Sequence, residues 1–255
     1  MKNLSTAEIE LFVTTNITDF HSKRLAIIKR LTLKQLLSKN PYLFRAKNIT
    51  TASELIEGTL SAFLSSSEEK LFGDFLENLA IFIANKTTNG HKSSSQGIDL
   101  EFEKNEIYYL ISVKSGPNWG NSSQHKKLAQ DLRAAEIRMK QSRQVGQVQP
   151  ALGICYGKTA TCFTKDGYLK VVGQNFWTLI SDNKDLYKQI IVPIGHRAKE
   201  YNDEFLNERG NISNLLTKNF IDSFCDSSGK IDWQHVVEFN SGNDDLDQFF
   251  NLKKI

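Results

Sequence analysis

Residues Gly97 to Trp119 read GIDLEFEKNEIYYLISVKSGPNW. Two short runs in this stretch, Ile98 to Glu103 and Ile107 to Lys114, are rich in β-branched and aromatic residues and alternate in polarity. Alternation with a period of two indicates half-buried strands, and the polar pair Asn105-Glu106 between them indicates a turn. The stretch therefore predicts a β-hairpin. The apolar residues of its first strand are expected on one face: Ile98, Leu100 and Phe102.

The register of this hairpin determines whether two charged residues meet. If Asn105 and Glu106 are the two turn residues, Asp99 lies directly opposite Ser112, and Lys114 lies one same-face step further along, within reach of the Asp99 carboxylate. A three-residue loop would put Asp99 and Lys114 on opposite faces. We predict the two-residue turn, because the chemistry considered next requires it.

An aspartate and a lysine at the end of an apolar hairpin can act together on a phosphate. The carboxylate can hold Mg²⁺, and the ammonium can stabilise the charge that develops or orient the attacking water. The alternative is a plain salt-bridged hairpin. Here the second strand runs directly into residues 115–121, a loop rich in glycine and polar amides. Binding groups concentrate in loops that a rigid scaffold holds, which favours the functional interpretation.

The pattern Gly97-x-Asp99, a short hairpin and Ser112-Val-Lys114-Ser-Gly-Pro-Asn-Trp resembles the PD-(D/E)xK nuclease superfamily and, more narrowly, the type II restriction endonucleases. A similarity to enzymes that cut GGNCC-cored sites accompanies it. In that family the aspartate binds metal, the residue two positions before the lysine is usually a second metal-binding carboxylate, and the lysine is catalytic. Asp99 and Lys114 match. Ser112 does not, because an alcohol is a poor substitute for a carboxylate on a hard cation.

The second carboxylate must then come from another element. The nearly all-apolar helical segment 71–85 contains Glu77, and a charge is expensive to bury unless it is paired or bound to metal. Glu77 could face solvent, pair with a lysine or reach the active site. Because many nucleases of the superfamily carry such a glutamate on the helix before the catalytic hairpin, the resemblance favours Glu77. Its rival is Glu101, about 7 Å further along the first strand, and weaker rivals are Asp131 and Glu136.

A second amphipathic helix is predicted from Gln124 to Arg143, with more cations than anions on its outward face. Together with the preceding loop it is the best candidate for DNA contact, although a solvated charged surface is the alternative. The free N–H groups at the start of a helix can also hold a phosphate. The residues that we expect to contact DNA are Asn118, Trp119, Asn121, Lys126, Lys127 and Arg133.

The remaining pattern predicts an α/β (α+β) fold with a restriction-endonuclease-like core. We expect a mixed central sheet flanked by helices, a helical N-terminal region over residues 1–50, and two helices over 51–85, the second of which opens at Ser67. Residues 87–96 are expected to form a polar loop. Further strands are predicted at the following ranges: 150–155, 161–164 and 169–172. We interpret residues 1–255 as a single nuclease domain with a catalytic core over 68–195 and a C-terminal region of unknown role over 196–255.

The helical N-terminal region carries a run of cations between Lys23 and Lys39. They are either a solvated helix face, or a basic face for phosphates or a dimer contact. The chain as a whole gives little indication of a nucleic-acid partner, because the net charge of its 255 residues is only +3.

Composition places the chain among ordinary soluble globular proteins, at 40% hydrophobic and 24% charged residues. Cys155, Cys162 and Cys225 have no paired spacing, which suits a reduced cytoplasm better than a disulfide or zinc framework. We see neither a signal peptide nor an apolar run long enough to span a bilayer.

The resemblance implies Mg²⁺-assisted hydrolysis of double-stranded DNA. Asp99, Glu77 and the carbonyl of Val113 would bind the metal, and Lys114 would position water or stabilise charge. The resemblance also implies a homodimer that cuts palindromes and a cognate DNA methyltransferase in the same restriction-modification system. Two alternatives remain: a repair or structure-specific nuclease on the same fold, and a DNA-binding module on a decayed nuclease fold, of which Ser112 would be the symptom.

Overall fold

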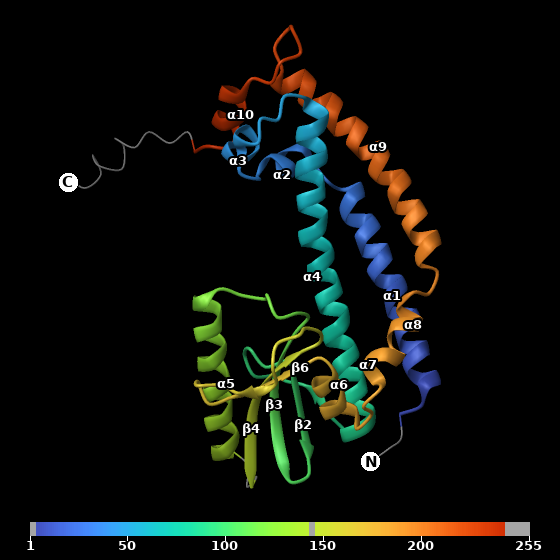
Figure 1. Cartoon of the computed structure of the whole chain (residues 1–255), viewed down its shortest axis with the longest axis vertical. Helices are drawn as coiled ribbons and strands as arrows, with labels where there is room; N and C mark the ends of the chain where they lie inside the picture. The colour runs from blue at the N-terminus through green and yellow to red at the C-terminus, as the bar shows by residue number, and fades with distance from the viewer. Residues whose placement is uncertain (1–3, 143–145, 243–255) are drawn as a thin grey trace, which may run out of the picture. The chain divides into compact units, whose positions relative to one another are not determined.

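The computed structural model describes residues 4–142 and 146–242, and these form two compact units (Figure 1). Unit 1 consists of Met1–Ser22 and Glu69–Ala198, and unit 2 of Lys23–Glu68 and Lys199–Ile255. Two long helices, α1 (Thr6–Lys29) and α4 (Ala52–Thr88), contribute residues to both units. The end of the predicted 124–143 helix at Arg143 and the last part of the C-terminal region lie outside the described residues.

Unit 1 is built on a six-stranded mixed sheet with the strand order β1-β2-β3-β4-β6-β5. Its strands are β1 (His91–Lys92), β2 (Leu100–Lys104), β3 (Ile107–Lys114), β4 (Gln147–Ile154), β5 (Cys162–Phe163) and β6 (Leu169–Val172). β3, β4 and β6 run parallel, whereas β1, β2 and β5 pair antiparallel with their neighbours. The strands expected at 150–155, 161–164 and 169–172 are present as β4, β5 and β6.

The predicted hairpin register is confirmed. Lys104 pairs with Ile107, so that the turn consists of Asn105 and Glu106 alone. Both turn residues have positive φ angles, 51° and 64°, as a two-residue turn of type I′ requires. The backbone N–H of Asp99 continues the ladder by donating to the carbonyl of Ile111 at 2.9 Å.

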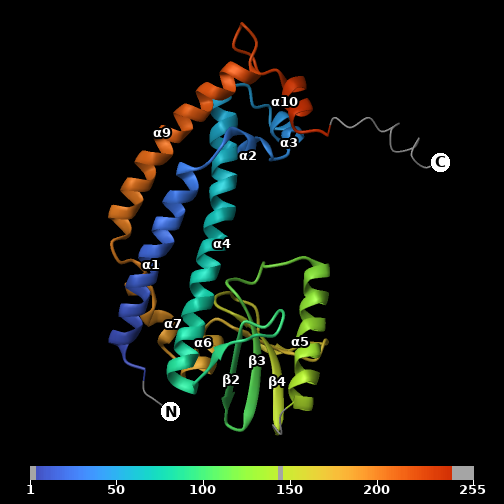
Figure 2. The ribbon, with the colours of Figure 1, turned by 180° about the vertical axis from the view of Figure 1, so that it is seen from behind.

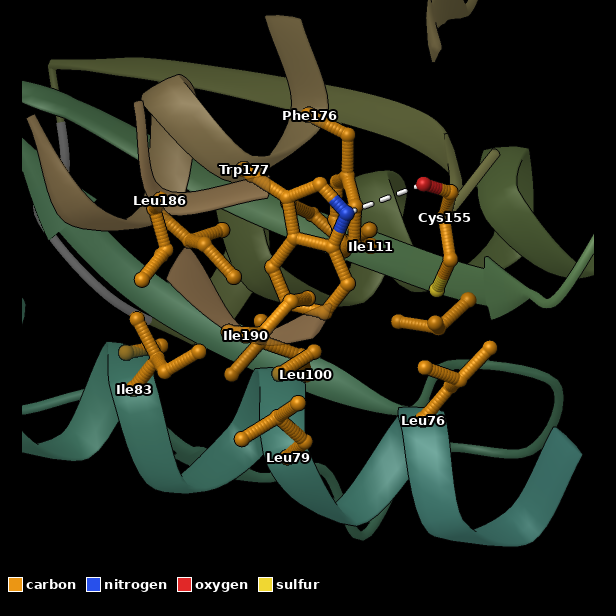
Figure 3. Close-up of a cluster of buried hydrophobic side chains, with 14 of the residues drawn as sticks. Leu76, Leu79, Ile83, Leu100, Ile111, Cys155, Phe176, Trp177, Leu186 and Ile190 are labelled. Atoms are coloured by element: carbon orange, nitrogen blue, oxygen red, sulfur yellow. Dashed lines mark hydrogen bonds between the residues drawn. The ribbon is translucent and has the colours of Figure 1, made fainter. Parts of the chain in front are cut away.

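Helices cover both faces of the sheet (Figures 1 and 2). On one face, α1, the C-terminal part of α4 and α6 (Gln174–Ser181) enclose the larger core, in which Trp177 donates its indole N–H to the carbonyl of Cys155 at 2.9 Å (Figure 3). On the other face lies α5 (Ser122–Ser142), whose buried side chains are Leu128, Leu132 and Ala135. Ile98 belongs to this second core, so its predicted place on the face of Leu100 and Phe102 was wrong.

Two further expectations about local structure were wrong. Residues 52–88 form one continuous helix rather than two, and in it the hydroxyls of Ser66 and Ser67 donate to the carbonyls of Ala62 and Phe63 instead of capping a new helix. The polar segment 87–96 contains β1, which pairs with β2 along one edge of the sheet. Two short helices, α7 (Leu186–Gln189) and α8 (Ile191–Ile194), follow α6.

Unit 2 is helical. It contains α2 (Leu33–Leu37), α3 (Pro41–Ala46), α9 (Ala198–Phe224) and α10 (Trp233–Phe239), with the adjoining parts of α1 and α4. A separate apolar core holds these helices together, and its largest fully buried members include Phe220, Ile28 and Leu36.

The molecule thus has the expected α/β architecture, a mixed sheet flanked by helices with a helical N-terminal region, consistent with a restriction-endonuclease-like fold. The assignment of 68–195 as the catalytic core and of 196–255 as a separate region stays a prediction. None of the helices in the described residues is long and apolar enough to cross a membrane.

Candidate active site

The start of β2 and the end of β3 bring Asp99 and Lys114 together, as the register predicts. Nζ of Lys114 lies 3.8 Å from Oδ2 of Asp99, and it donates a hydrogen bond to the carbonyl oxygen of Val113 at 2.9 Å. Both charged side chains are partly exposed, by 32% for Lys114 and 21% for Asp99. The pair is therefore ordered by the sheet and still open to a ligand.

A single oxygen of Asp99 receives the hydrogen bonds that hold this carboxylate. Oδ2 accepts from the backbone N–H of Val113 at 2.6 Å and from the hydroxyl of Ser112 at 3.2 Å. Among the described residues nothing donates to the other oxygen, Oδ1. Oδ1 is thus left to accept from or bind an external partner, while the hydrogen bonds to Oδ2 fix the orientation of the carboxylate.

Glu77 lies on α4, within range of the charges of Asp99 and Lys114, and its role as the second carboxylate stays a prediction. Burial raises the pKa of its carboxyl, and the negative charge of Asp99 raises it further, whereas Lys92 and Lys114 oppose the rise. Nζ of Lys92 lies 3.3 Å from Oε1 of Glu77. The charges of Asp99 and Lys114 therefore both act on Glu77, the first raising the pKa of its carboxyl and the second lowering it.

The rival carboxylates are engaged elsewhere. Glu101 is buried, at 5% exposure, and its carboxylate accepts from the hydroxyl of Tyr108 at 2.7 Å and from that of Ser93. On α5, Asp131 pairs with Lys127 at 2.7 Å, and Glu136 pairs with Lys140 at 2.6 Å. Glu77, by contrast, is acted on by the charge of Asp99, and it stays the predicted second carboxylate.

The available donors fit a hard cation. Two carboxylates and the carbonyl of Val113 are oxygen ligands, and Mg²⁺ typically takes one or two carboxylates and completes its shell with water and phosphate. Within residues 4–142 and 146–242, no cluster of three or more histidine, cysteine, aspartate or glutamate side chains is placed to hold a metal by itself. These residues could thus supply only part of the coordination shell of Mg²⁺, and water and the substrate phosphate would complete it.

The six residues expected to contact DNA lie in and after the loop that follows β3. Asn118, Asn121, Lys126, Lys127 and Arg133 are exposed, and Trp119 is half-buried. Two of these side chains already have partners within the protein, and these partners compete with the expected contacts to DNA. The Asn121 carboxamide oxygen accepts from the backbone N–H of Gln124 at 3.1 Å and so caps α5, and Lys127 is paired with Asp131. Their contacts with DNA stay predictions.

Trp119 has a position that the sequence did not indicate. Its ring centroid lies 5.7 Å from Nζ of Lys114 and 4.3 Å from the ring of His125. Lys114 thus has an aromatic wall on one side and Asp99 on another, which limits where its ammonium can go.

The sequence reasoning also missed the residues that anchor β1 beside the site. Ser93 donates to Glu101, and His91 lies 3.9 Å from the same carboxylate, so a buried acid fixes the strand that carries Lys92. A two-residue strand is too short to show a period, so no sequence signal marked it.

A family model described as "Type II restriction endonuclease EcoO109I" matches residues 7–202, which is well over half of the chain and includes Glu77, Asp99 and Lys114. A search of the curated proteins found no match. Because this one match spans the whole of the sheet and the hairpin site, the chain belongs to the EcoO109I family of type II restriction endonucleases, which are DNA-binding, site-specific deoxyribonucleases.

Proposed function

We propose that the protein is an Mg²⁺-dependent endonuclease that cuts both strands of a short palindromic DNA site, with the PD-(D/E)xK chemistry at Asp99, Glu77 and Lys114. The observation that carries the proposal is the approach of Lys114 to 3.8 Å from Asp99 at one end of the β2–β3 hairpin, and the effect of both charges on the pKa of Glu77 supports it. The family membership supports DNA as the substrate. A GGNCC-cored site, first suggested by the resemblance, is part of the proposal.

The chain's own residues have separate tasks in this reaction. Asp99 and Glu77, with the carbonyl of Val113, would hold the metal, which when bound polarises the scissile phosphate and makes water a better nucleophile. Ser112 and the N–H of Val113 keep Asp99 oriented through Oδ2. The Lys114 ammonium would hold the attacking water or stabilise the negative charge that develops on the phosphate oxygens.

Each chain carries one such site, so a double-strand cut at a palindrome calls for two chains related by two-fold symmetry. We therefore propose a homodimer. We also propose a cognate DNA methyltransferase, because a cell that holds such a nuclease must protect its own sites, and we place both proteins in the cytoplasm with the DNA.

The test is cleavage of phage DNA by the purified protein with Mg²⁺ or with EDTA, beside the variants Lys114→Ala and Glu77→Ala. Glu103→Ala is the matched control, because Glu103 is an exposed carboxylate on β2, the strand that begins directly after Asp99. Discrete fragments should form only with Mg²⁺. Each of the two site variants should lose about a hundredfold or more in rate, the usual cost of removing one group that stabilises the transition state. The control should cut normally.

Other outcomes would reassign the roles. Discrete fragments that survive Glu77→Ala would move the second carboxylate elsewhere, and Glu101→Gln would then be compared. Cleavage that depends on a bubble or a flap instead of on sequence would indicate a structure-specific nuclease. No cleavage by any form, with DNA binding retained, would mean a decayed module and would overturn the proposal.

A further inference from the structure

The most concentrated charge of the chain lies outside the unit that carries Asp99 and Lys114. Residues 23–50 contain eight lysine or arginine side chains and no aspartate or glutamate, whereas the net charge of the whole chain is only +3. The rest of the chain is therefore net negative. All eight cations belong to unit 2.

Two of the eight are used within the protein. Arg24 forms an ion pair with Glu68, donates to Asn202 at 3.3 Å and stacks on Phe205 with 3.4 Å between guanidinium and ring centroid. Lys23 also interacts within the chain. The other six, which we call the basic surface, have no carboxylate within ion-pair distance among the described residues: Lys29, Arg30, Lys34, Lys39, Arg45 and Lys47.

The backbone under the basic surface is held in place. A capping box at Thr32 and Gln35 begins α2, and the Asn40 side chain caps α3 by accepting from the N–H groups of Tyr42 and Leu43 at 3.0 and 3.3 Å. Buried side chains on both helices anchor them in the core of unit 2: Leu36, Leu37 and Phe44. The cations thus project from a fixed scaffold, and little ordering entropy would oppose binding to a rigid partner.

Aromatic side chains lie among these cations. The guanidinium of Arg45 lies 5.8 Å from the centre of the Trp233 ring on α10, and Nζ of Lys47 lies 5.7 Å from that of Phe44. The two views place α2, α3 and α10 together (Figures 1 and 2). Tyr42 is 67% exposed on α3, and a tyrosine hydroxyl is a common donor to phosphate oxygens.

We propose that the basic surface binds the sugar-phosphate backbone of double-stranded DNA and supplies affinity that does not depend on sequence. The inference rests on the proposed function, because it takes the DNA to be the substrate of the nuclease site. Unneutralised cations on a fixed surface are the usual footprint of phosphate contact. A second copy of the chain fits poorly, because two such surfaces would repel one another in an isologous contact.

The experiment measures binding of a random-sequence DNA duplex in EDTA, so that cleavage does not interfere, over a range of salt concentrations. The variant is Lys34→Gln with Lys47→Gln. The matched control is Lys199→Gln with Lys218→Gln, which removes the same charge from exposed positions of the same unit. For the first pair the slope of log K against log salt should fall by about 1.8, and Kd near physiological salt should rise by about tenfold to a hundredfold. Circular dichroism and the urea midpoint should stay at their wild-type values.

A slope equal to that of the wild type, or an equal loss in the control pair, would overturn the inference. So would binding to phosphatidylserine vesicles that the first pair weakens while DNA binding stays unchanged, since the surface would then serve a lipid. Failure of the proposed function looks different: the protein would bind DNA with the expected salt slope and would not cleave it under any condition.

Discussion

Ser112 helps to orient the Asp99 carboxylate. In the proposed PD-(D/E)xK chemistry a second acid would usually stand at that position, and here a buried hydroxyl, 1% exposed, donates to Oδ2 of Asp99. A carboxylate at 112 would add a third negative charge beside Asp99 and Glu77. Serine at 112 is therefore compatible with the proposed role of Glu77: β3 supplies the orienting hydrogen bond, and α4 would supply the second negative charge.

Replacing Glu77 by glutamine, in buffer without divalent cations, should raise the free energy of unfolding at neutral pH. Burial and the charge of Asp99 raise the pKa of Glu77, so the folded protein binds this proton more tightly than the unfolded chain does. Protonated Glu77 therefore stabilises the folded wild type at pH values below the ordinary glutamate pKa. This stability is lost as the pH rises through the raised pKa of Glu77 in the folded protein. Glutamine does not ionise, so the variant does not lose stability in this way. Lys92 loses its ion-pair partner in the variant, but its ammonium stays in contact with water, because its side chain is 66% exposed.

Urea unfolding at acidic and neutral pH measures this difference. The advantage of Glu77→Gln over the wild type should be present at neutral pH and should shrink toward zero at about pH 4. Added Mg²⁺ should raise the urea midpoint of the wild type more than that of the variant, because only the wild type keeps both carboxylates. A variant that is less stable than the wild type at both pH values would show that Glu77 is held by favourable contacts, and the argument from burial would fail.

At the scale of elements, Gly153 in β4 explains how α6 approaches the sheet. A Cβ at this position would lie 2.4 Å from Cε2 of Phe176 and 3.1 Å from Cγ2 of Ile111, and Phe176 is fully buried (Figure 3). Gly153→Ala should therefore destabilise unit 1 by about 1–3 kcal/mol, the usual cost of overpacking. Urea unfolding checks this against Gly146→Ala, where an added Cβ meets nothing within 4 Å. Equal midpoints for the two variants would contradict the packing argument.

The hairpin and the Asp99–Lys114 pair could be predicted because their determinants are local. Alternation of polarity assigns the faces, and a two-residue turn fixes the register, so that one choice at Asn105-Glu106 places both charged residues. Glu77 was within reach of sequence reasoning because a carboxylate in an apolar helix needs an explanation. The effect of the Asp99 charge on Glu77 depends on tertiary structure, and the helix pattern alone left the place of Glu77 open.

Other features depended on contacts that a sequence does not display. The serines at 65–67 resemble a helix cap, and only the surrounding helix shows that Ser66 and Ser67 bond back to carbonyls four residues earlier. β1 pairs with β2, and Ser93, directly after β1, donates to the buried Glu101 of that strand. Ile98 lies just before β2, where the strand period no longer assigns the face. In each case the surrounding structure, which the local pattern does not display, decides the outcome.

At the scale of the molecule, charge and chemistry are carried by different parts of the chain. The basic surface belongs to unit 2, and the Asp99–Lys114 site belongs to unit 1. A net charge of +3 conceals this division, because acidic residues elsewhere offset the cations of residues 23–50. Affinity for DNA and cleavage should therefore respond separately to substitution, the first through the slope with salt and the second through the rate.

The proposed homodimer gives a prediction of its own for strand cutting. Chains co-expressed as a mixture of wild type and Lys114→Ala should form mixed dimers with one working site. On supercoiled plasmid such dimers should cut one strand and let open circles accumulate, whereas the wild-type dimer should give linear product. Sedimentation should report twice the chain mass of 28.9 kDa for all three species.

The wild-type and all-variant dimers, purified by separate tags from the same cells, are the controls for mixing. If the mixed species gives linear DNA at half the wild-type rate without open circles, one site cuts both strands in turn, and the two-fold argument fails. If every species sediments as a monomer and the wild type still linearises the plasmid, two monomers must act in succession, and the symmetry would then lie in the DNA site alone. Accumulated open circles from a stable mixed dimer would instead tie each strand to one Lys114, as a single site per chain requires.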